Sequence, residues 1–264
     1  MAEIRHLTNG IDVIVFGEGP RPFVIIPGMS VAQLVQSAVL IENAFKESFS
    51  KAFTMYLMDA REDMYEGYRI EDMARDCADA MKELGVSHAC VFGASQGGMI
   101  AQVLAAKYPE LIDKVIIGSA AYHNNDVSRD TFTAWIRLSN AGDIVEANRG
   151  IFRRIHSPQK LKDNADAFRV LEREGSVKEF AHYAVMARAC LEFDGTDYLE
   201  ALSKIKDRIL VIGDKTDNVF TGDASVELAE KIGCELFMYD GYGHTVYDSA
   251  PDYQSRMKEF FERT

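Results

Sequence analysis

The chain carries Gly93-Ala94-Ser95-Gln96-Gly97-Gly98 at the end of its first third, and this stretch decides the fold class. It directly follows the apolar run 88–92, which is typical of a buried strand, and it precedes a helical pattern at 99–107. A serine between a strand and a helix lies on a tight turn from which its hydroxyl oxygen projects. Glycine-X-serine-X-glycine is a weak signal by itself, but this position makes Ser95 a candidate nucleophile.

Two other interpretations of the glycine-rich stretch are a structural turn and a phosphate-binding loop. A dinucleotide loop needs the spacing GxGxxG after the first strand and an acidic residue about 20 positions later. Gly93, Gly97 and Gly98 do not have that spacing. The structural turn remains open until Ser95 is shown to have catalytic partners.

Apolar runs alternate with helical patterns along most of the chain, which predicts an α/β fold: a mostly parallel sheet of about eight strands with helices on both faces. We expect the first two strands to form an antiparallel edge, joined by a hairpin at 17–22. The predicted strands are 11–16, 23–26, 54–58, 88–92, 114–118, 209–213 and 234–238, and the predicted helices are 30–39, 70–84, 99–107, 223–231 and 253–262.

The block 122–202 interrupts this alternation. It contains no apolar strand run, is rich in charged residues and helix formers, and contains the single tryptophan, Trp135. We therefore predict a helical cap at 122–202, inserted into a core domain made of 1–121 and 203–264.

A serine nucleophile needs a histidine to accept its proton and a carboxylate to hold the tautomer of that histidine. Among six histidines, His244 alone lies in a glycine-flanked loop directly after the last strand, at the sheet edge expected to carry Ser95. Asp214 and Asp217 both follow the strand 209–213. We prefer Asp217, and Asp214 remains the competing choice. Either one gives the chain order serine, aspartate, histidine, with each residue after the carboxyl end of a predicted strand.

Composition narrows the range of partners. The formal net charge of −12 argues against nucleic-acid binding, which depends on lysine and arginine at phosphates. No run approaches the roughly 20 apolar residues of a membrane helix, and the first residues lack a signal-peptide pattern, so we expect a cytoplasmic protein without membrane association. The four cysteines are dispersed, as Cys77, Cys90, Cys190 and Cys234, which favours buried reduced thiols over a disulfide framework or a metal site. No cofactor is expected, and the oligomeric state is not predicted.

Five segments resemble the α/β-hydrolase superfamily, and together they extend over nearly the whole chain. They are Ile25-Ile26-Pro27-Gly28, Asp59-Ala60-Arg61, 93–98, Gly213-Asp214-Lys215-Thr216-Asp217 and Gly241-Tyr242-Gly243-His244. The resemblance supports Asp217 as the acid, and it implies an oxyanion hole formed by the backbone amides of Gln96 and Met29. Two departures from the family occur: Pro27-Gly28 replaces a common histidine-glycine, and Asp59-Ala60-Arg61-Glu62 is a degraded Asp-x-Arg-Gly, which we interpret as a structural turn.

Substrate choice in this architecture is expected to depend on the cap. Gly28 and Trp135 are our candidate substrate-binding residues, although aromatic residues on helices are more often part of a core. Arg149, Arg153, Arg154 and Arg188 are candidates for binding a substrate carboxylate, against the more common role of solvated helix faces or ion pairs.

These observations together predict a serine hydrolase that cleaves a small carboxylic ester, or a thioester or amide, through an acyl-enzyme. One alternative is carbon–carbon bond hydrolysis or perhydrolysis by the same triad. Another is a non-catalytic ligand-binding protein or receptor of the same fold, against which the intact set of Ser95, Asp217 and His244 argues. Serine at position 95 also argues against the dehalogenases and epoxide hydrolases that the chain resembles, because those enzymes use aspartate there.

Overall fold

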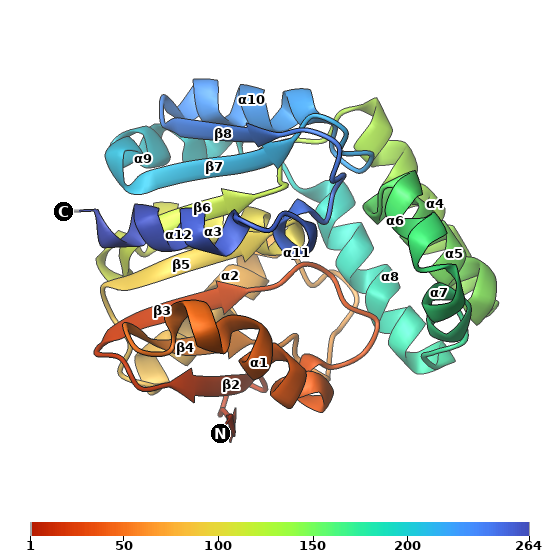
Figure 1. The fold of residues 1–264 in the computed structure, drawn as a ribbon, viewed down its shortest axis with the longest axis horizontal. Helices are drawn as coiled ribbons and strands as arrows, with labels where there is room; N and C mark the ends of the chain where they lie inside the picture. Colours follow the sequence, from red (N-terminus) through yellow and green to blue (C-terminus); the bar gives the residue numbers. More distant parts are fainter. Residues whose placement is uncertain (1, 264) are drawn as a thin grey trace.

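The computed structural model describes residues 2–263 and contains a single eight-stranded sheet (Figure 1). The order of strands across the sheet is β1-β2-β4-β3-β5-β6-β7-β8. Strands β3 to β8 run parallel, and β1 and β2 are antiparallel additions at one edge. The strands are β1 (Glu3–His6), β2 (Asp12–Gly17), β3 (Arg21–Ile26), β4 (Phe53–Met58), β5 (Ala89–Ala94), β6 (Ile112–Gly118), β7 (Ile209–Asp214) and β8 (Glu235–Tyr239).

Twelve α-helices and four short 3-10 helices lie within the described residues 2–263. None of the helices in that range is long and apolar enough to cross a membrane. The α-helices are α1 (Ala38–Phe49), α2 (Ile70–Glu83), α3 (Gln96–Lys107), α4 (Asp126–Asn140), α5 (Ile144–Ile155), α6 (Pro158–Asp163), α7 (Ala165–Leu171), α8 (Val177–Glu192), α9 (Leu199–Ser203), α10 (Gly222–Ile232), α11 (Val246–Ser249) and α12 (Tyr253–Glu262). The 3-10 helices are η1 (Leu34–Ser37), η2 (Pro109–Leu111), η3 (Thr196–Tyr198) and η4 (Lys206–Arg208).

The predicted mostly parallel sheet with helices on both faces is confirmed, but the predicted leading hairpin is wrong. Strand β4 lies between β2 and β3, and β3 is parallel to both of its neighbours, β4 and β5. The burial pattern gives the physical reason. The residues Phe23–Ile26 are all buried, as expected for a central parallel strand covered on both faces. The sequence pattern also does not predict β1, because all four of its residues are exposed.

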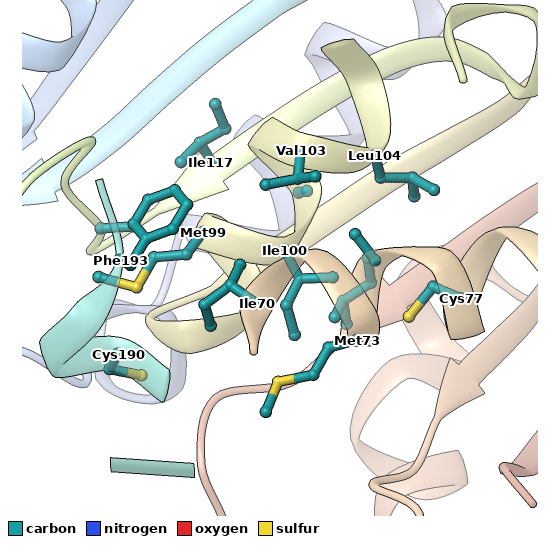
Figure 2. Packing of buried hydrophobic residues seen from close by; sticks show 14 of the residues in the cluster. Ile70, Met73, Cys77, Met99, Ile100, Val103, Leu104, Ile117, Cys190 and Phe193 are labelled. Atoms are coloured by element: carbon teal, nitrogen blue, oxygen red, sulfur yellow. The ribbon is translucent and has the colours of Figure 1, made fainter. Parts of the chain in front are cut away.

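Side chains alternate across the sheet and so build a core on each face. In β5, Ala89 and Val91 face the cluster formed with α2, α3 and α10, whereas Cys90 and Phe92 face the cluster formed with α1, α11 and α12. Figure 2 shows part of the first cluster, with the apolar side chains of α2 and α3 interleaved. The sheet is therefore buried on both faces.

The helix predicted at 30–39 is displaced in the structure. Residues 27–33 form an irregular loop, η1 follows at 34–37, and the α-helix begins at Ala38 and continues to Phe49. The apolar spacing of Leu34, Val35 and Ala38 marks the approach to α1 and not its body. The loop that results passes over the carboxyl end of β5.

We call residues 119–208, between β6 and β7, the β6–β7 insertion. Within it, α4 packs against α8 and α5, and the strands of the sheet do not continue. Figure 1 shows α4 to α8 gathered at the end of the sheet toward which the parallel strands point. Helix α9 crosses the predicted boundary at 202 and packs against α3 and α10. The division into core domain and cap domain remains a prediction.

Candidate active site

Ser95 lies at the junction of β5 and α3. Its backbone is in a strained region with φ of 55° and ψ of −119°. Two sets of hydrogen bonds hold it there: its amide donates to the carbonyl of Gly118 at 2.8 Å, and its carbonyl accepts from the amides of Gly98 and Met99 at 2.9 and 3.2 Å. The chain therefore turns sharply at the serine, and α3 begins at Gln96.

The glycines around Ser95 are required by close approach. A Cβ atom at Gly97 would overlap the backbone carbonyls of β3, and one at Gly93 would overlap the carbonyl of Gly97. A Cβ atom at Gly98 would lie 2.6 Å from the Cβ of Ala120. The turn thus depends on three residues without side chains.

His244 joins Ser95 to Asp217. Its Nε2 lies 2.8 Å from Oγ of Ser95, and its Nδ1 lies 2.9 Å from Oδ2 of Asp217. With the proton on Nδ1, the imidazole donates to the carboxylate and accepts from the serine hydroxyl. The ring of Phe220 packs against the imidazole with centroids 5.7 Å apart. The structure therefore brings the three predicted catalytic side chains into one continuous chain of hydrogen bonds.

Asp217 is fixed by the loop after β7. Its Oδ1 accepts from the amides of Val219 and Phe220 at 2.7 and 3.2 Å, which leaves Oδ2 for His244. The carboxylate is buried, and its two oxygens are divided between backbone and imidazole. This arrangement suits a carboxylate that orients the imidazole.

Asp214, the competing acid, has other partners. Its Oδ1 accepts from the amide and the hydroxyl of Thr216, at 2.8 and 2.6 Å, and its Oδ2 accepts from the amide of Tyr242 at 3.0 Å. The carboxylate is fully buried and braces the loop after β7 against the loop after β8. It has no hydrogen bond to His244 in the described residues.

Gly28 lies beside the serine hydroxyl, Met29 follows it in the same loop, and Gln96 follows Ser95 in the chain. A Cβ atom at Gly28 would lie 3.2 Å from Cβ and 3.7 Å from Oγ of Ser95, so the loop after β3 passes directly beside the nucleophile. Within residues 2–263, the backbone amides of Met29 and Gln96 donate no hydrogen bond to another group of the protein. Both amides are thus available as donors, and their role as an oxyanion hole remains a prediction.

The side chains of Gln96 and Met29 contact helix α8. Nε2 of Gln96 donates to the carbonyl of Met186 at 3.1 Å and to Sγ of Cys190 at 3.3 Å. The same thiol lies 3.9 Å from Sδ of Met29. Burial raises the pKa of Cys190 to about 12, so this thiol stays neutral. Sequence reasoning identified Cys190 only as a buried cysteine.

The side chain of Trp135 packs against other residues of the β6–β7 insertion. Its Nε1 donates to the carbonyl of Gly150 at 3.3 Å, and its ring packs edge-on against Phe132 and Tyr183. Its indole is almost fully buried, and the cavity that it borders contains Arg153 and Arg154 but not Ser95. Substrate binding by Trp135 therefore remains a prediction.

Two of the arginines proposed to bind a substrate carboxylate contact other groups of the protein. Arg149 pairs with Glu146 and Glu172, each at 2.9 Å, and Arg154 donates to the carbonyl of Asn218 at 3.3 Å. The contacts of Arg149 are the ion pairs weighed as the alternative, and that of Arg154 is a hydrogen bond to the backbone.

No sequence pattern indicates the contact between α5 and the loop that carries His244. Nδ1 of His156 lies 2.9 Å from Oγ1 of Thr245, and the amide of Thr245 donates to the carbonyl of Ile155 at 3.1 Å. Burial, with a smaller contribution from the positive charge of Lys160, lowers the pKa of His156 to about 4. The β6–β7 insertion thus contacts the residue next to His244.

No cluster of three or more histidine, cysteine, aspartate or glutamate side chains within residues 2–263 has the arrangement of a metal site.

Comparisons with known proteins identify the family of this chain. Residues 53–251 match the family described as alpha/beta hydrolase fold. Serine hydrolase BPHL of Mus musculus is 32% identical over 122 residues, which cover 43% of this chain and 40% of that protein.

Two solved structures superimpose over nearly the full length. MGS-M2, an alpha/beta hydrolase from a Medee basin deep-sea metagenome library, gives a TM-score of 0.82 at 19% identity, with 99% of this chain and 98% of that chain covered. The enol-lactonase from Burkholderia xenovorans LB400 gives 0.81 at 18% identity, with 99% and 100% covered. The family match covers most of the chain, and the chain therefore belongs to the alpha/beta hydrolase fold family.

Proposed function

We propose that this protein is a serine hydrolase that cleaves a small carboxylic ester through an acyl-enzyme intermediate. The observation that carries the proposal is the continuous hydrogen-bond chain from Ser95 through His244 to Asp217. Chance packing rarely aligns a strained serine, a correctly oriented imidazole and a buried carboxylate at the carboxyl edge of one sheet.

In the acylation step, Oγ of Ser95 attacks the ester carbonyl while Nε2 of His244 takes the hydroxyl proton. The Asp217 carboxylate stabilises the imidazolium that forms. The free amides of Met29 and Gln96 hold the oxyanion of the tetrahedral intermediate. His244 then donates its proton to the departing alcohol oxygen as the carbon–oxygen bond breaks.

In the deacylation step, water occupies the place of the alcohol. Nε2 of His244 removes a proton from the water, the hydroxide oxygen attacks the acyl carbon, and the bond to Oγ of Ser95 breaks. The carboxylic acid leaves and the serine regains its proton. These steps require no metal and no cofactor, and the partner is a small-molecule substrate.

The comparisons support hydrolysis as the reaction class. The matched relative is named a serine hydrolase, and a structural neighbour is named an enol-lactonase, whose name indicates a cyclic ester as its substrate. The geometry also disfavours a non-catalytic ligand-binding role, because a binding protein has no need for an aligned nucleophile, base and acid.

Turnover of p-nitrophenyl acetate tests the proposal. We expect wild-type protein to release nitrophenolate with saturation kinetics, and Ser95→Ala to lower kcat by at least about a thousandfold. Ser119→Ala is the matched control, because Ser119 is a buried serine with positive φ at the end of β6 and has no hydrogen-bond partner for its hydroxyl in the described residues. Equal activity of the wild type and Ser95→Ala would contradict the proposal.

A further inference from the structure

An apolar cavity of about 50 Å³ lies next to the candidate oxyanion hole. Its wall includes Gly28 and Gln96 at one end and the buried side chains of Met73, Cys77 and Ile100 deeper in the core. Figure 2 shows Met73 and Cys77 of α2 together with Ile100 of α3 in the packing between these helices. The cavity thus begins beside Ser95 and extends into the core between α2 and α3.

The position of this cavity relative to His244 determines which part of an ester can occupy it. None of the residues in its wall comes from the loops after β7 or β8, which carry Asp217 and His244. A departing alcohol must stay within reach of Nε2 of His244 to receive its proton, so it cannot lie in this cavity. The remaining substituent on the reacting carbon is the acyl chain.

We propose that the cavity bounded by Gly28, Gln96, Met73, Cys77 and Ile100 is the acyl-binding pocket, and that it selects short, uncharged acyl groups. The inference rests on the proposed serine hydrolase function. A larger cavity of about 260 Å³ has Met29, Ile155 and Tyr183 in its wall. Its wall also lacks residues from the loops after β7 and β8, but the carbonyl of Ile155 accepts from the amide of Thr245, next to His244, so this cavity is the one that leaves room for the alcohol.

The volume of the cavity limits the length of the acyl group that it can hold. A cavity of about 50 Å³ holds roughly three to five water-sized groups, which corresponds to an acyl chain of about two to four carbons. Methionines in the wall, Met58, Met64, Met73 and Met186, allow small adjustments without opening a longer channel.

Asp59 determines which charge the pocket accepts on an acyl group. Its carboxylate is in the cavity wall and accepts from the amides of Val35 and Ala60 at 2.9 and 2.8 Å. Burial raises its pKa to about 6, so it is ionised at pH 8 and repels an anionic acyl chain. Arg61 also borders the cavity, but its guanidinium is already bound by Asp63 and Asp76.

A chain-length series of p-nitrophenyl esters at pH 8, from acetate to octanoate, tests the pocket. Wild-type kcat/KM should peak at or below butyrate. Met73→Ala enlarges the cavity and should raise the ratio of hexanoate to acetate by about tenfold, whereas Cys77→Phe fills it and should lower the ratio of butyrate to acetate by about tenfold. The hemisuccinate ester, which matches butyrate in length, should be cleaved at least about tenfold more slowly than butyrate.

Met81→Ala is the matched control. Met81 is a buried methionine two turns further along α2, and it does not border the cavity. The same truncation there should leave the chain-length ratios unchanged. If Met73→Ala fails to fold, Met64→Ala decides the question, because Met64 borders the same cavity and is only half-buried.

The results separate the two proposals. One outcome would overturn the acyl-pocket proposal and leave the hydrolase proposal intact. In it, ester cleavage is lost in Ser95→Ala, but the chain-length ratios of Met73→Ala and Met64→Ala equal those of Met81→Ala. Preference for hemisuccinate over butyrate would overturn the charge selection. Absence of any cleavage by folded wild-type protein would instead contradict the hydrolase function itself.

Discussion

At the residue scale, two aspartates on one loop have different partners. Asp217 divides its oxygens between His244 and the amides of Val219 and Phe220, whereas Asp214 accepts only from Thr216 and Tyr242. The first arrangement orients an imidazole, and the second holds two loops together. Hydrogen-bond partners therefore distinguish two residues that the sequence left in competition.

Exchanging each aspartate for asparagine separates these two roles. We expect Asp217→Asn to lower kcat by about a thousandfold to ten-thousandfold, because the amide no longer supports the required tautomer of His244. Asp214→Asn should lower the free energy of unfolding by about 1–3 kcal/mol, because an amide cannot accept all three donors, and it should reduce kcat far less. Ester hydrolysis and urea unfolding of both variants measure this, and the opposite pattern would transfer the catalytic role to Asp214.

At the scale of elements, the β6–β7 insertion contacts the loops that carry the candidate acid and base. Asn125 caps α4 by accepting from the amide of Ser128 at 2.9 Å, and its Nδ2 donates to the carbonyl of Phe220 at 2.6 Å. Next to that carbonyl, Thr221 has a positive φ of 73°. One side chain thus joins the start of a helix to the loop that holds Asp217.

Two substitutions of Asn125 separate the helix cap from the loop contact. Asn125→Asp keeps the cap but loses the donor to Phe220, so we expect kcat to fall several-fold while most of the stability is retained. Asn125→Ala loses both and should also cost about 1–2 kcal/mol of stability. Thermal unfolding and kcat for the two variants check this. Unchanged kcat in both would show that the contact does not position the acid.

His156 makes the second contact, and it should respond to pH. Its folded-state pKa of about 4 lies below the ordinary 6.5, so the unfolded chain binds the proton more readily between these values. Its contribution to stability is complete above about pH 6.5 and is lost as the pH falls toward 4. His156→Phe keeps a ring next to Phe152 and Phe168 but does not titrate.

Thermal unfolding between pH 4.5 and 7.5 measures this effect. The Tm of the wild type should fall relative to that of His156→Phe as the pH is lowered. Parallel Tm curves for the two proteins would contradict the burial of a neutral histidine at this contact.

At the scale of the whole molecule, the features that were predictable from the sequence are those that repeat or follow chain order. Strand runs alternating with helical patterns predict the sheet, and Ser95, Asp217 and His244 follow β5, β7 and β8 in the expected chain order. The position of β4 between β2 and β3 was not predictable, because strand order is set by long-range pairing that leaves no local pattern.

Other features depend on close tertiary contacts. The loop at 27–33 has helix-forming residues but is held irregular beside Ser95, so its pattern predicted a helix that is absent there. The link between Cys190, Gln96 and Met29 and the link between His156 and Thr245 join positions about 90 residues or more apart. No spacing in the sequence indicates such pairs, and the same holds for the cavity between α2 and α3.

Reaction of the folded protein with a fluorophosphonate tests the central claim most directly. The probe reacts with a serine only when a base activates its hydroxyl and an oxyanion hole receives the phosphoryl oxygen. We predict a single adduct on the peptide that carries Ser95, lost in Ser95→Ala and after unfolding in denaturant. Folded wild-type protein that shows no adduct at Ser95 would contradict the account.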